Sequence, residues 1–521
     1  MKNCGVAYGD RFKTCLQSGL LNYSLFVFNY SLKRKAVSTV NLFDIVYEDE
    51  RSGLTDCVIG KVTDDNRLVE KGDVFVAISG RNFDGHDFCA DMLEKGASAV
   101  VTERDLGLSQ QIIVKNSREH FSILASRYYG NPTKKLKLIA ATGTNGKTTT
   151  SNLIKEIMNL SGHTCGYIGT SGYDVCGKVY EARLTTPRQM DLYRYFREMV
   201  DNGAEYCVME ASSQALSQYR FAGERFVCGI FLNLTQDHLD WHGTMENYYK
   251  AKKSLFRFCD NAVINTDDKY GKRLYDELSR GKDKINLVSV SSSDVADFFA
   301  VNIKLRAGGV SYWLSSSADE KSFPVTFSMP GRFNVENSLC AVAACCQSGL
   351  DIKTACDNLQ QVKGVCGRAE VLYDGKFTVI CDYAHTEDGL RKILSTVREF
   401  AKKRLIVVFG AAGERDAGKR KAMGECVGEY ADIAVVTSDN PRFEDPQTII
   451  DMVLEGFSDS FCQVESFIDR LEAIKLAVSV AADGDVIVLC GKGHEKYQVI
   501  GDDYQPFSEH DIIKELTDNI S

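Results

Sequence analysis

A buried strand that ends in a glycine-rich loop constrains this chain more than any other feature. Residues 136–150 read LKLIAATGTNGKTTT, and a helical pattern, SNLIKEIMNL, follows at once. Such a loop curls around phosphate oxygens, so that backbone N–H groups and the helix start face the anion. In this pattern Lys147 reaches the outer phosphates and the Thr148 hydroxyl lies on Mg²⁺. The loop predicts a nucleoside triphosphate site, although Ala141 replaces the pattern's first glycine; a plain turn with a solvated Lys147 is the alternative.

The composition bounds the class of protein. At 521 residues the chain is long enough for about three domains. Hydrophobic residues make up 44% and charged residues 26%, as in globular proteins with a sizeable core. Acidic residues outnumber lysine and arginine by 71 to 62, which argues against a broad nucleic-acid surface but not against a local basic pocket. The 18 cysteines lack paired metal-ligand spacing and often lie in apolar runs, so they predict a reducing, cytoplasmic compartment.

The order of strand-like and helical patterns predicts an α/β protein of three domains. Residues 37–135 contain a strand, VFVAIS, followed by a helical pattern. From 136 to 366, and again from 367 to 521, apolar strands alternate with helices in the βαβ rhythm of a parallel sheet. We expect a small N-terminal α/β domain, a central P-loop ATPase-like parallel-sheet domain and a C-terminal Rossmann-like α/β domain. Residues 1–36 form an N-terminal extension of unknown role, whose apolar stretch is too short to span a bilayer.

Most apolar strands of the second and third domains end in charged, amide or glycine residues. Glu210 follows YCVM, Asp382 follows TVIC, and the sequence DNPR follows AVVTS. In parallel α/β sheets, ligands bind outside the carboxyl ends of the strands. Turn chemistry alone explains glycines after strands, but it explains repeated acids, histidines and arginines poorly. We therefore predict that two sheets close on one ligand cleft.

Three residues point to metal and phosphate chemistry, each with a structural alternative. Glu210 has the position of a second Mg²⁺-binding acid in P-loop enzymes, and His238 lies in DHLDWHG after the next strand. Mg²⁺ prefers oxygen, so a histidine ligand is unusual unless carboxylates stand beside it. For each of the two residues alone, a structural role is as plausible as a catalytic one. Lys252 belongs to a lysine-rich helical stretch, YYKAKKSLF, whose default interpretation is a solvated helix face.

Together these segments resemble the Mur ligase family, and within it the MurE branch, over residues 40–515. TGTNGKTT, the Glu210 strand, DHLDWHG and the YxxAK stretch are similar to the family's ATP and Mg²⁺ apparatus. The resemblance implies a set of catalytic residues: Lys147, Glu210, His238 and Lys252. It implies Mg²⁺ as cofactor, with ligands from Thr148, Glu210, His238 and a CO₂-derived carbamate on Lys252. ATP would contact the loop and three later residues: Gly143, Thr144, Asn145, Gly146, Lys147, Thr148, Thr149, Asn337, Arg368 and Asp382.

The resemblance also implies the reaction, an ATP-dependent amide ligation through an acyl phosphate. It would join meso-diaminopimelate to the D-glutamate γ-carboxylate of UDP-MurNAc-L-Ala-D-Glu, in bacterial peptidoglycan precursor synthesis. Domain 37–135 would bind the UDP part. The nucleotide dipeptide would contact Asn66, Thr185, Thr186, Ser212, Gln218 and Arg220. Diaminopimelate would contact Arg415, Asp439, Asn440, Pro441, Arg442, Gly491 and Glu495.

Arg442 favours diaminopimelate as the incoming amino acid. Diaminopimelate carries an extra amino-carboxylate end, which a guanidinium holds through two parallel hydrogen bonds, whereas lysine offers nothing there. An Asx–Pro turn after a strand is the alternative explanation of DNPR. Four residues depart from the family pattern, without removing a proposed metal or phosphate ligand: Gln214 replaces a histidine, Cys366 and Glu387 replace prolines, and His510 replaces an arginine.

Three other functions stay open from the sequence. The same ligation could use L-lysine or another diamino acid. A folylpolyglutamate-type ligase shares the loop and a two-lobed core, but the N-terminal domain and DNPR argue against it. A nucleotide-switched binding protein would leave the acids and arginines of the third domain without a role. In every case we expect a monomer with small-molecule partners and neither a nucleic acid nor a membrane partner.

Overall fold

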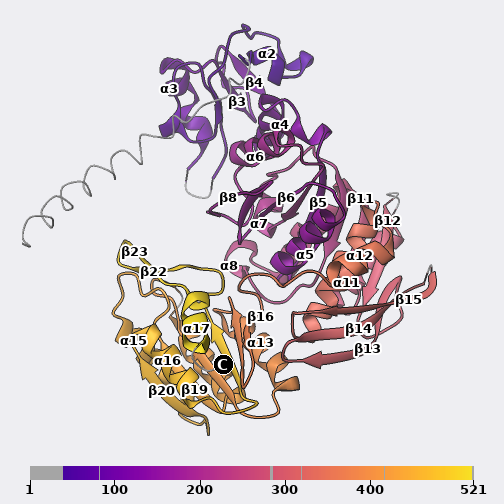
Figure 1. The fold of residues 1–521 in the computed structure, drawn as a ribbon. Coiled ribbons are helices and arrows are strands. Elements are labelled where there is room, and N and C mark those ends of the chain that lie inside the picture. The colour runs from indigo at the N-terminus through magenta and orange to yellow at the C-terminus, as the bar shows by residue number, and fades with distance from the viewer. Residues whose placement is uncertain (1–38, 81–82, 282–284, 318, 416, 519–521) are drawn as a thin grey trace, which may run out of the picture. The chain divides into compact units, whose positions relative to one another are not determined.

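The computed structural model describes residues 39–80, 83–281, 285–317, 319–415 and 417–518, and the predicted extension 1–36 lies outside them. The chain divides into two compact units. The first ends at Ser117 and also includes Arg127–Tyr129, and the second comprises Arg118–Ser126 and Gly130–Ser521. Both combine helices and strands, as Figure 1 shows. Among the described residues, no helix is long and apolar enough to cross a membrane.

The first unit contains a small parallel sheet. Its order is β1-β2-β3-β4, with all neighbours parallel. Phe75 and Val100 on the sheet pack with Cys89 and Met92 of helix α3 in one hydrophobic cluster. The elements are α2 (Leu42–Ile45), β1 (Val62–Thr63), β2 (Val74–Val76), α3 (Cys89–Glu94), β3 (Ala99–Thr102) and β4 (Gln111–Ile113), and α4 (Ser117–Tyr128) contributes to both units.

The second unit begins with an eleven-stranded sheet whose inner strands are parallel. The parallel strands, in spatial order, are β12 (Asn286–Ser291), β11 (Cys259–Asn265), β10 (Phe226–Phe231), β5 (Lys137–Thr142), β9 (Tyr206–Glu210) and β6 (Cys165–Gly169). Beyond β12, the strand β13 (Phe298–Arg306) is still parallel to its neighbour, and β14 (Gly309–Ser316) and β15 (Asp319–Phe327) then follow in antiparallel order. At the other edge, β7 (Gly172–Val175) and β8 (Lys178–Tyr180) extend the sheet in antiparallel order beyond β6. The sequence predicted the parallel part but not these flanks. In β13, whose outer neighbour β14 is antiparallel, the pattern of buried and exposed residues is that of a strand covered on one face.

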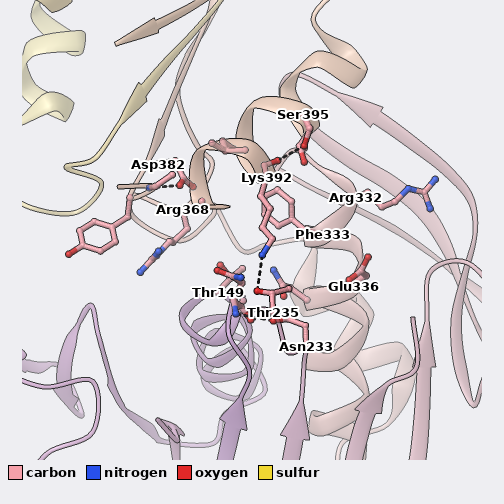
Figure 2. Close-up of a pocket in the computed structure, with 18 of the residues that line it drawn as sticks. Thr149, Asn233, Thr235, Arg332, Phe333, Glu336, Arg368, Asp382, Lys392 and Ser395 are labelled. Atoms are coloured by element: carbon pink, nitrogen blue, oxygen red, sulfur yellow. Dashed lines mark hydrogen bonds between the residues drawn. The ribbon is translucent and has the colours of Figure 1, made fainter. Parts of the chain in front are cut away.

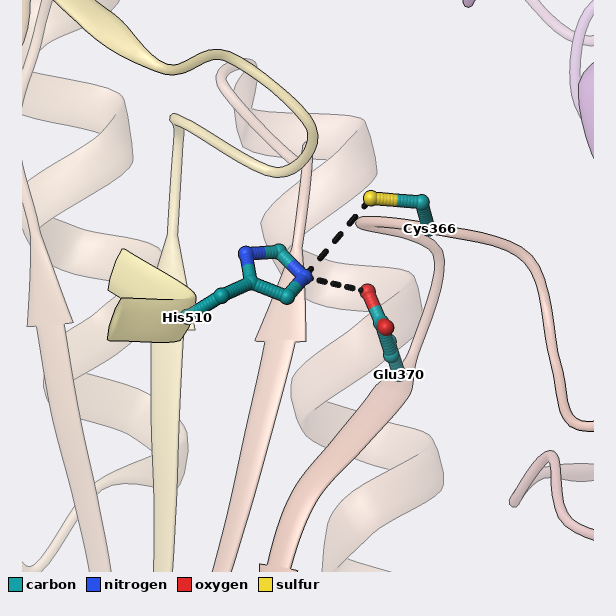
Figure 3. A group of neighbouring side chains, drawn as sticks. All are labelled: Cys366, Glu370 and His510. Atoms are coloured by element: carbon teal, nitrogen blue, oxygen red, sulfur yellow. Dashed lines mark hydrogen bonds and ion pairs between the residues drawn. The ribbon is translucent and has the colours of Figure 1, made fainter. Parts of the chain in front are cut away.

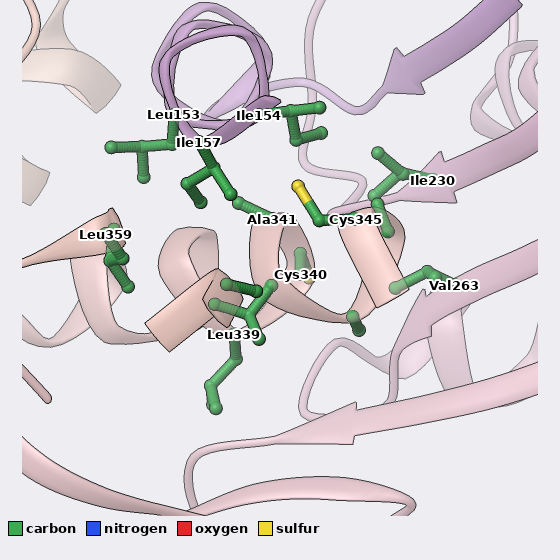
Figure 4. Close-up of a cluster of buried hydrophobic side chains, with 14 of the residues drawn as sticks. Leu153, Ile154, Ile157, Ile230, Val263, Leu339, Cys340, Ala341, Cys345 and Leu359 are labelled. Carbon is green, nitrogen blue, oxygen red and sulfur yellow. The ribbon is translucent and has the colours of Figure 1, made fainter. Parts of the chain in front are cut away.

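Helices α5, α11 and α12 form the main core with this sheet. Figure 4 shows Leu153 and Ile157 of α5 against Ala341 and Cys345 of α11, with Ile230 of β10 beside them. The small Ala and Cys side chains let the two helices approach closely. The helices are α5 (Lys147–Leu160), α6 (Gln189–Asp201), α7 (Ser213–Ser217), α8 (Leu239–His242), α9 (Met245–Lys253), α10 (Lys269–Ser279), α11 (Arg332–Gln347) and α12 (Ile352–Leu359). This packing fixes the start of α5 at the carboxyl end of β5.

A six-stranded sheet completes the second unit, in the order β16-β17-β21-β18-β19-β20. Only β16 runs antiparallel to its neighbour among these strands. The strands are β16 (Glu370–Asp374), β17 (Thr378–Asp382), β18 (Leu405–Phe409), β19 (Ile433–Thr437), β20 (Gln463–Phe467) and β21 (Val486–Cys490), and a hairpin of β22 (Tyr497–Ile500) and β23 (Asp503–Pro506) follows. The helices are α13 (Glu387–Phe400), α14 (Gly418–Tyr430), α15 (Pro446–Leu454), α16 (Arg470–Val480) and α17 (Glu509–Asp518).

A fully buried ion pair fixes the carboxyl ends of these strands. Arg470 at the start of α16 donates to Glu509 Oε1 from Nε at 2.9 Å and from a terminal nitrogen at 2.7 Å. The same guanidinium donates to the carbonyl of Cys490, the last residue of β21, at 2.8 Å. Both charged side chains are fully buried. Arg470 therefore holds α17 and the end of β21 in one arrangement.

Removing this guanidinium should destabilise the protein strongly. The Arg470→Met variant keeps much of the side-chain volume but leaves the Glu509 carboxylate buried without its partner, so we expect the free energy of unfolding to fall by about 3–5 kcal/mol. Urea unfolding measures this change. Lys475→Met is the control, because Lys475 on the same helix makes only an exposed ion pair with Glu472. Equal stability of the two variants would contradict the role given to Arg470.

Candidate functional site

The phosphate-binding loop is held by the helix and strand beside it. Gly146 precedes α5 with φ +83°, and a Cβ there would lie 2.4 Å from the side-chain oxygen of Asn337 on α11. The N–H of Asn145 donates to the side-chain oxygen of Asn233, which follows β10, at 2.9 Å. Position 146 therefore needs glycine twice over, for its left-handed backbone and for the close approach of α11. The strand, loop and helix have the predicted order.

Two lysines share one carbonyl oxygen of this loop. Lys147 Nζ donates to the carbonyls of Gly143 and Thr144, each at 2.9 Å, and Lys252 Nζ donates to Gly143 O at 2.7 Å. Lys252 is only 1% exposed, whereas Lys250 on the same helix is exposed. Burial, and secondly the charge of Lys147, hold the pKa of Lys252 well below its usual value. Lys252 is thus not part of a solvated helix face.

Glu210 is fixed at the end of β9, next to the loop. Its Oε1 accepts the Tyr167 hydroxyl at 2.5 Å and the Thr170 N–H at 2.9 Å, and its Oε2 accepts the Thr170 hydroxyl at 3.1 Å. Burial lowers the pKa of Lys147, and the charges of Glu210 and Asp237 oppose that shift. The two carboxylates therefore lie close enough to Lys147 for their charges to act on its ammonium group.

His238 lies further out, on the surface of the same region. It precedes α8 with φ 52°, and its ring lies edge-on to the Tyr248 ring at 6.0 Å. The Tyr248 hydroxyl lies 3.3 Å from the Thr144 hydroxyl of the loop. Tyr248 thus connects His238 to the loop, and the role of His238 as a metal ligand stays a prediction.

A pocket of about 470 Å³ adjoins the loop and is lined from both sheets (Figure 2). Arg368 and Asp382 come from the C-terminal side, and Lys392 of α13 reaches Thr235 at 3.4 Å. Arg368 donates to the Thr148 hydroxyl at 3.4 Å, and its Nε is buried without a hydrogen-bond partner in the described structure. A buried guanidinium N–H of this kind is well suited to an anionic ligand. The predicted ATP residues in the lining are Asn145, Gly146, Thr149, Asn337, Arg368 and Asp382.

Other lining residues were missed in the sequence. The last residue of β11, Asn265, and the two acids that follow it, Asp267 and Asp268, line the pocket. Helix α11 supplies Phe333 and Glu336. The run NTDD after an apolar strand was a usable signal, because it repeats the pattern of polar strand ends. Glu336 could not be found in this way, because it lies within a helix and does not follow an apolar strand. Burial, and secondly the charge of Asp267, raise its pKa to about 7.

A second group of predicted residues lies around the backbone of Glu210. The Thr186 hydroxyl donates to the carbonyl of Glu210 at 2.7 Å and to the Ser212 hydroxyl at 3.2 Å. Arg220 donates to the carbonyl of Thr186 and, at 2.8 Å, to the side chain of Gln218. Thr185 joins the group, because the Thr170 hydroxyl bridges to it at 3.3 Å and to Glu210. Asn66, the remaining residue of this prediction, lies in the first unit.

A third group lies at the carboxyl ends of β19 and β21. The buried Lys492 donates to the side chains of Asn440 at 2.8 Å and Glu495 at 2.7 Å, and lies 3.5 Å from Asp439. The Asn440 amide also donates to Glu495 at 3.1 Å. The sequence analysis named Gly491 and Glu495 but gave Lys492, which lies between them, no role; in the structure Lys492 holds the group together.

Arg442 is placed by its backbone rather than by its side chain. It has φ 54°, its N–H donates to the carbonyl of Val499 at 3.0 Å, and it pairs with Ile500 of β22. Pro441 precedes it, and Gly491 lies against Asp439. Arg415, by contrast, is exposed in the loop after β18. The structure therefore groups Asp439, Asn440, Pro441, Gly491 and Glu495, and holds Arg442 at their edge.

Comparison with known proteins covers most of the chain. Three family descriptions match: the Mur ligase family catalytic domain over residues 59–136, the Mur ligase middle domain over 141–345, and the Mur ligase glutamate ligase domain over 367–493. The chain is 41% identical over 467 residues to the UDP-N-acetylmuramoyl-L-alanyl-D-glutamate--2,6-diaminopimelate ligase of Clostridium tetani, which covers 88% of this chain and 94% of that protein. The chain belongs to the Mur ligase family.

Solved structures agree with membership of the Mur ligase family. A solved UDP-N-acetylmuramoyl-L-alanyl-D-glutamate--2,6-diaminopimelate ligase matches 89% of this chain and 95% of its own, with a TM-score of 0.67 and 31% identity. The folylpolyglutamate synthase of Thermotoga maritima matches 72% of this chain and 90% of its own with a TM-score of 0.55, but at 17% identity it shows the fold alone. The predicted α/β three-domain fold and the ATP-dependent ligase class are confirmed.

Gly146 offers a test of the loop geometry. In Gly146→Ala the new methyl group would push against Asn337, so we expect ATP affinity to fall at least about tenfold, which corresponds to about 1.4 kcal/mol. Isothermal titration measures the affinity. Gly162→Ala is the matched control, because Gly162 also has a left-handed backbone, with φ +85°, but nothing within 4 Å of the new methyl. That control should lose about 1–2 kcal/mol of stability and keep its ATP affinity; an equal loss of affinity in both would refute the role of the contact with Asn337.

Proposed function

We propose that this chain joins meso-diaminopimelate to the D-glutamate γ-carboxylate of UDP-MurNAc-L-Ala-D-Glu, with conversion of ATP to ADP and phosphate, in the bacterial cytoplasm. The observation that carries the proposal is the arrangement in the second unit of a phosphate loop and an amine-binding group. Lys147 and Glu210 belong to the phosphate site, and Asn440, Arg442 and Glu495 belong to the amine-binding group. The likeness to the Clostridium tetani ligase supports the same reaction.

The chemistry requires an activated carboxylate. The γ-carboxylate attacks the γ-phosphate of ATP, ADP leaves, and an acyl phosphate forms; the amine then attacks the carbonyl carbon and phosphate leaves. Lys147 and the loop N–H groups stabilise the negative charge on the transferring phosphoryl group. Arg368, whose buried Nε has no hydrogen-bond partner among the described residues, would hold the nucleotide from the other side of the pocket. Mg²⁺ would neutralise charge on the β- and γ-phosphates.

The donor groups beside the loop fit Mg²⁺. The Glu210 carboxylate and the Thr148 hydroxyl are hard oxygen donors, which Mg²⁺ prefers. Glu210 is held rigidly by Tyr167 and Thr170, so its orientation does not depend on the metal. We propose Thr148, Glu210, His238 and the modified Lys252 as the residues that hold the ion.

We propose that Lys252 is carbamylated by CO₂. Only the neutral amine reacts with CO₂, and burial together with the charge of Lys147 favours the neutral form. As an ammonium, Lys252 repels Lys147 across their shared contact with Gly143. As a carbamate it would attract Lys147 and present oxygen atoms to Mg²⁺. The buried position thus supports a modification that a solvated lysine would not retain.

The amino-acid site distinguishes diaminopimelate from lysine by charge. Arg442 at the edge of the group would hold the distal carboxylate through two parallel hydrogen bonds. Asp439, Asn440 and Glu495 offer acceptors for the distal ammonium, and Lys492 keeps those acceptors in position. Lysine lacks the distal carboxylate and would leave Arg442 without its ligand.

An assay of product formation tests this function directly. Purified protein is incubated with ATP, Mg²⁺, the muramoyl dipeptide nucleotide and either meso-diaminopimelate or L-lysine. We expect product with diaminopimelate, and little with lysine. Faster ligation of lysine would contradict the specificity, and glutamylation of tetrahydrofolate would support a folylpolyglutamate-type ligase instead. ATP turnover that needs neither the dipeptide nor an amino acid would support a nucleotide-switched binding protein.

Lys252 should be essential for turnover. Lys252→Ala removes the proposed metal-binding carbamate, so we expect kcat to fall about 100-fold or more, with no rescue by bicarbonate. Steady-state phosphate release measures the loss. Lys250→Ala is the control, because Lys250 is exposed on the same helix. Activity of Lys252→Ala near that of wild type would show that the buried amine has only a structural role.

Arg442 should affect one substrate only. In Arg442→Ala the distal carboxylate of diaminopimelate loses a charged partner worth about 1.5–3 kcal/mol, so we expect its KM to rise roughly tenfold or more while the KM for ATP stays unchanged. Arg442→Lys keeps the charge but not the two parallel hydrogen bonds, so its KM for diaminopimelate should lie between that of the wild type and that of Arg442→Ala. An equal rise in both KM values would place Arg442 outside the amino-acid site.

A further inference from the structure

Two residues that depart from the family pattern lie together in the folded chain. Cys366 Sγ lies 3.6 Å from His510 Nε2, and the same nitrogen lies 2.8 Å from Glu370 Oε2. Figure 3 shows the thiol, the imidazole and the carboxylate converging on one point. The three potential ligand atoms all lie within 4.8 Å of one another. Residues 366 and 510 are far apart in the sequence, so only the fold brings them together.

The spacing of these atoms is compatible with one metal ion. Zn²⁺ binds sulfur at about 2.3 Å and nitrogen or oxygen at about 2.0–2.2 Å, so ligand atoms in a tetrahedral site lie about 3–4 Å apart. Small side-chain rotations would bring the observed distances into that range. Cys366 is exposed, while Glu370 and His510 are partly buried, so a water molecule can fill the fourth position.

The chemistry of the ligands selects the kind of metal. A thiolate beside an imidazole favours Zn²⁺ and related transition metals, whereas Mg²⁺ prefers oxygen ligands and does not select a thiolate. The N–H of Gly367 donates to Glu370 Oε2 at 2.6 Å, which orients the carboxylate as neighbouring hydrogen bonds do in established metal sites. The group is therefore distinct in chemistry from the oxygen donors beside the phosphate loop.

We propose that Cys366, Glu370 and His510 bind one divalent transition metal ion of the Zn²⁺ type. The ion would join the segment before β16 to helix α17, because Glu370 begins β16 and His510 lies in the first turn of α17. Arg368, which lines the nucleotide pocket, lies between the first two ligands in the sequence. The metal would thereby stiffen the segment that presents Arg368. The proposal does not depend on the identity of the amino acid that the enzyme ligates.

Cobalt substitution tests the site in the full-length chain. The reduced, chelator-treated protein is titrated with Co²⁺ in excess Mg²⁺, and the thiolate-to-cobalt charge-transfer absorption is followed. We expect one equivalent of Co²⁺ to produce the band and Zn²⁺ to remove it. Because loss of a residue that merely orients a ligand weakens metal affinity about 10–100-fold, removing a ligand itself in Cys366→Ser or His510→Arg should weaken it at least about 100-fold.

The choice of variants separates metal binding from folding. His510→Arg keeps a cation next to Glu370, so it should retain the fold, which thermal unfolding checks. Cys462→Ser is the control, because Cys462 is a free cysteine of the same unit whose side chain is also accessible, although less than that of Cys366, and this variant should keep the band. Absence of the band in the wild type would show the group to be only a hydrogen-bonded cluster. A band that survives both Cys366→Ser and His510→Arg, or that disappears in Cys462→Ser, would place the metal elsewhere and overturn the proposal.

Discussion

The carbonyl of Gly143 accepts hydrogen bonds from the side-chain nitrogens of both Lys147 and Lys252, and the rest of the phosphate site depends on this contact. Two like charges in a buried place repel each other, and a stable arrangement needs compensating anions. Glu210 and Asp237 supply part of that compensation, and a triphosphate would supply more. A carbamate on Lys252 would turn the repulsion into attraction. The local charge balance therefore explains why an acid, a loop and a buried lysine from separate elements lie together.

Packing behind the loop gives this site its rigidity. Helices α5 and α11 approach closely through small side chains, and this closeness brings Asn337 against Gly146. The apolar contacts in Figure 4 thus set the position of a polar group in the nucleotide pocket. In the C-terminal sheet, the buried ion pair of Arg470 and Glu509 plays the same part, because it fixes the end of β21, next to the residues of the proposed amino-acid site. In both parts of the second unit, buried contacts next to the sheet fix the positions of the polar groups at the strand ends.

The sequence predicted the parts that have local signals. The loop and the polar ends of β9, β17 and β19 could be found because a strand, a turn and a helix follow one another within a few residues. Lys492 and Glu336 could not be assigned roles, since their importance comes from residues distant in sequence: Lys492 from Asn440, and Glu336 from Asp267 on another element. The antiparallel flanks of the central sheet were missed for a related reason, because strand direction depends on the neighbouring strand. The roles proposed for His238, Arg415 and the other site residues, and the domain boundaries, remain predictions.

The pocket in Figure 2 has walls from two sheets, and this has a kinetic consequence. Lys392 contacts Thr235, and Asn145 contacts Asp388, across the same space. A nucleotide that fills the space would contact residues of both sheets and so strengthen their association, which couples its departure to their separation. We therefore expect the rate at which the two sheets separate to influence the turnover number, in addition to the rate of bond formation.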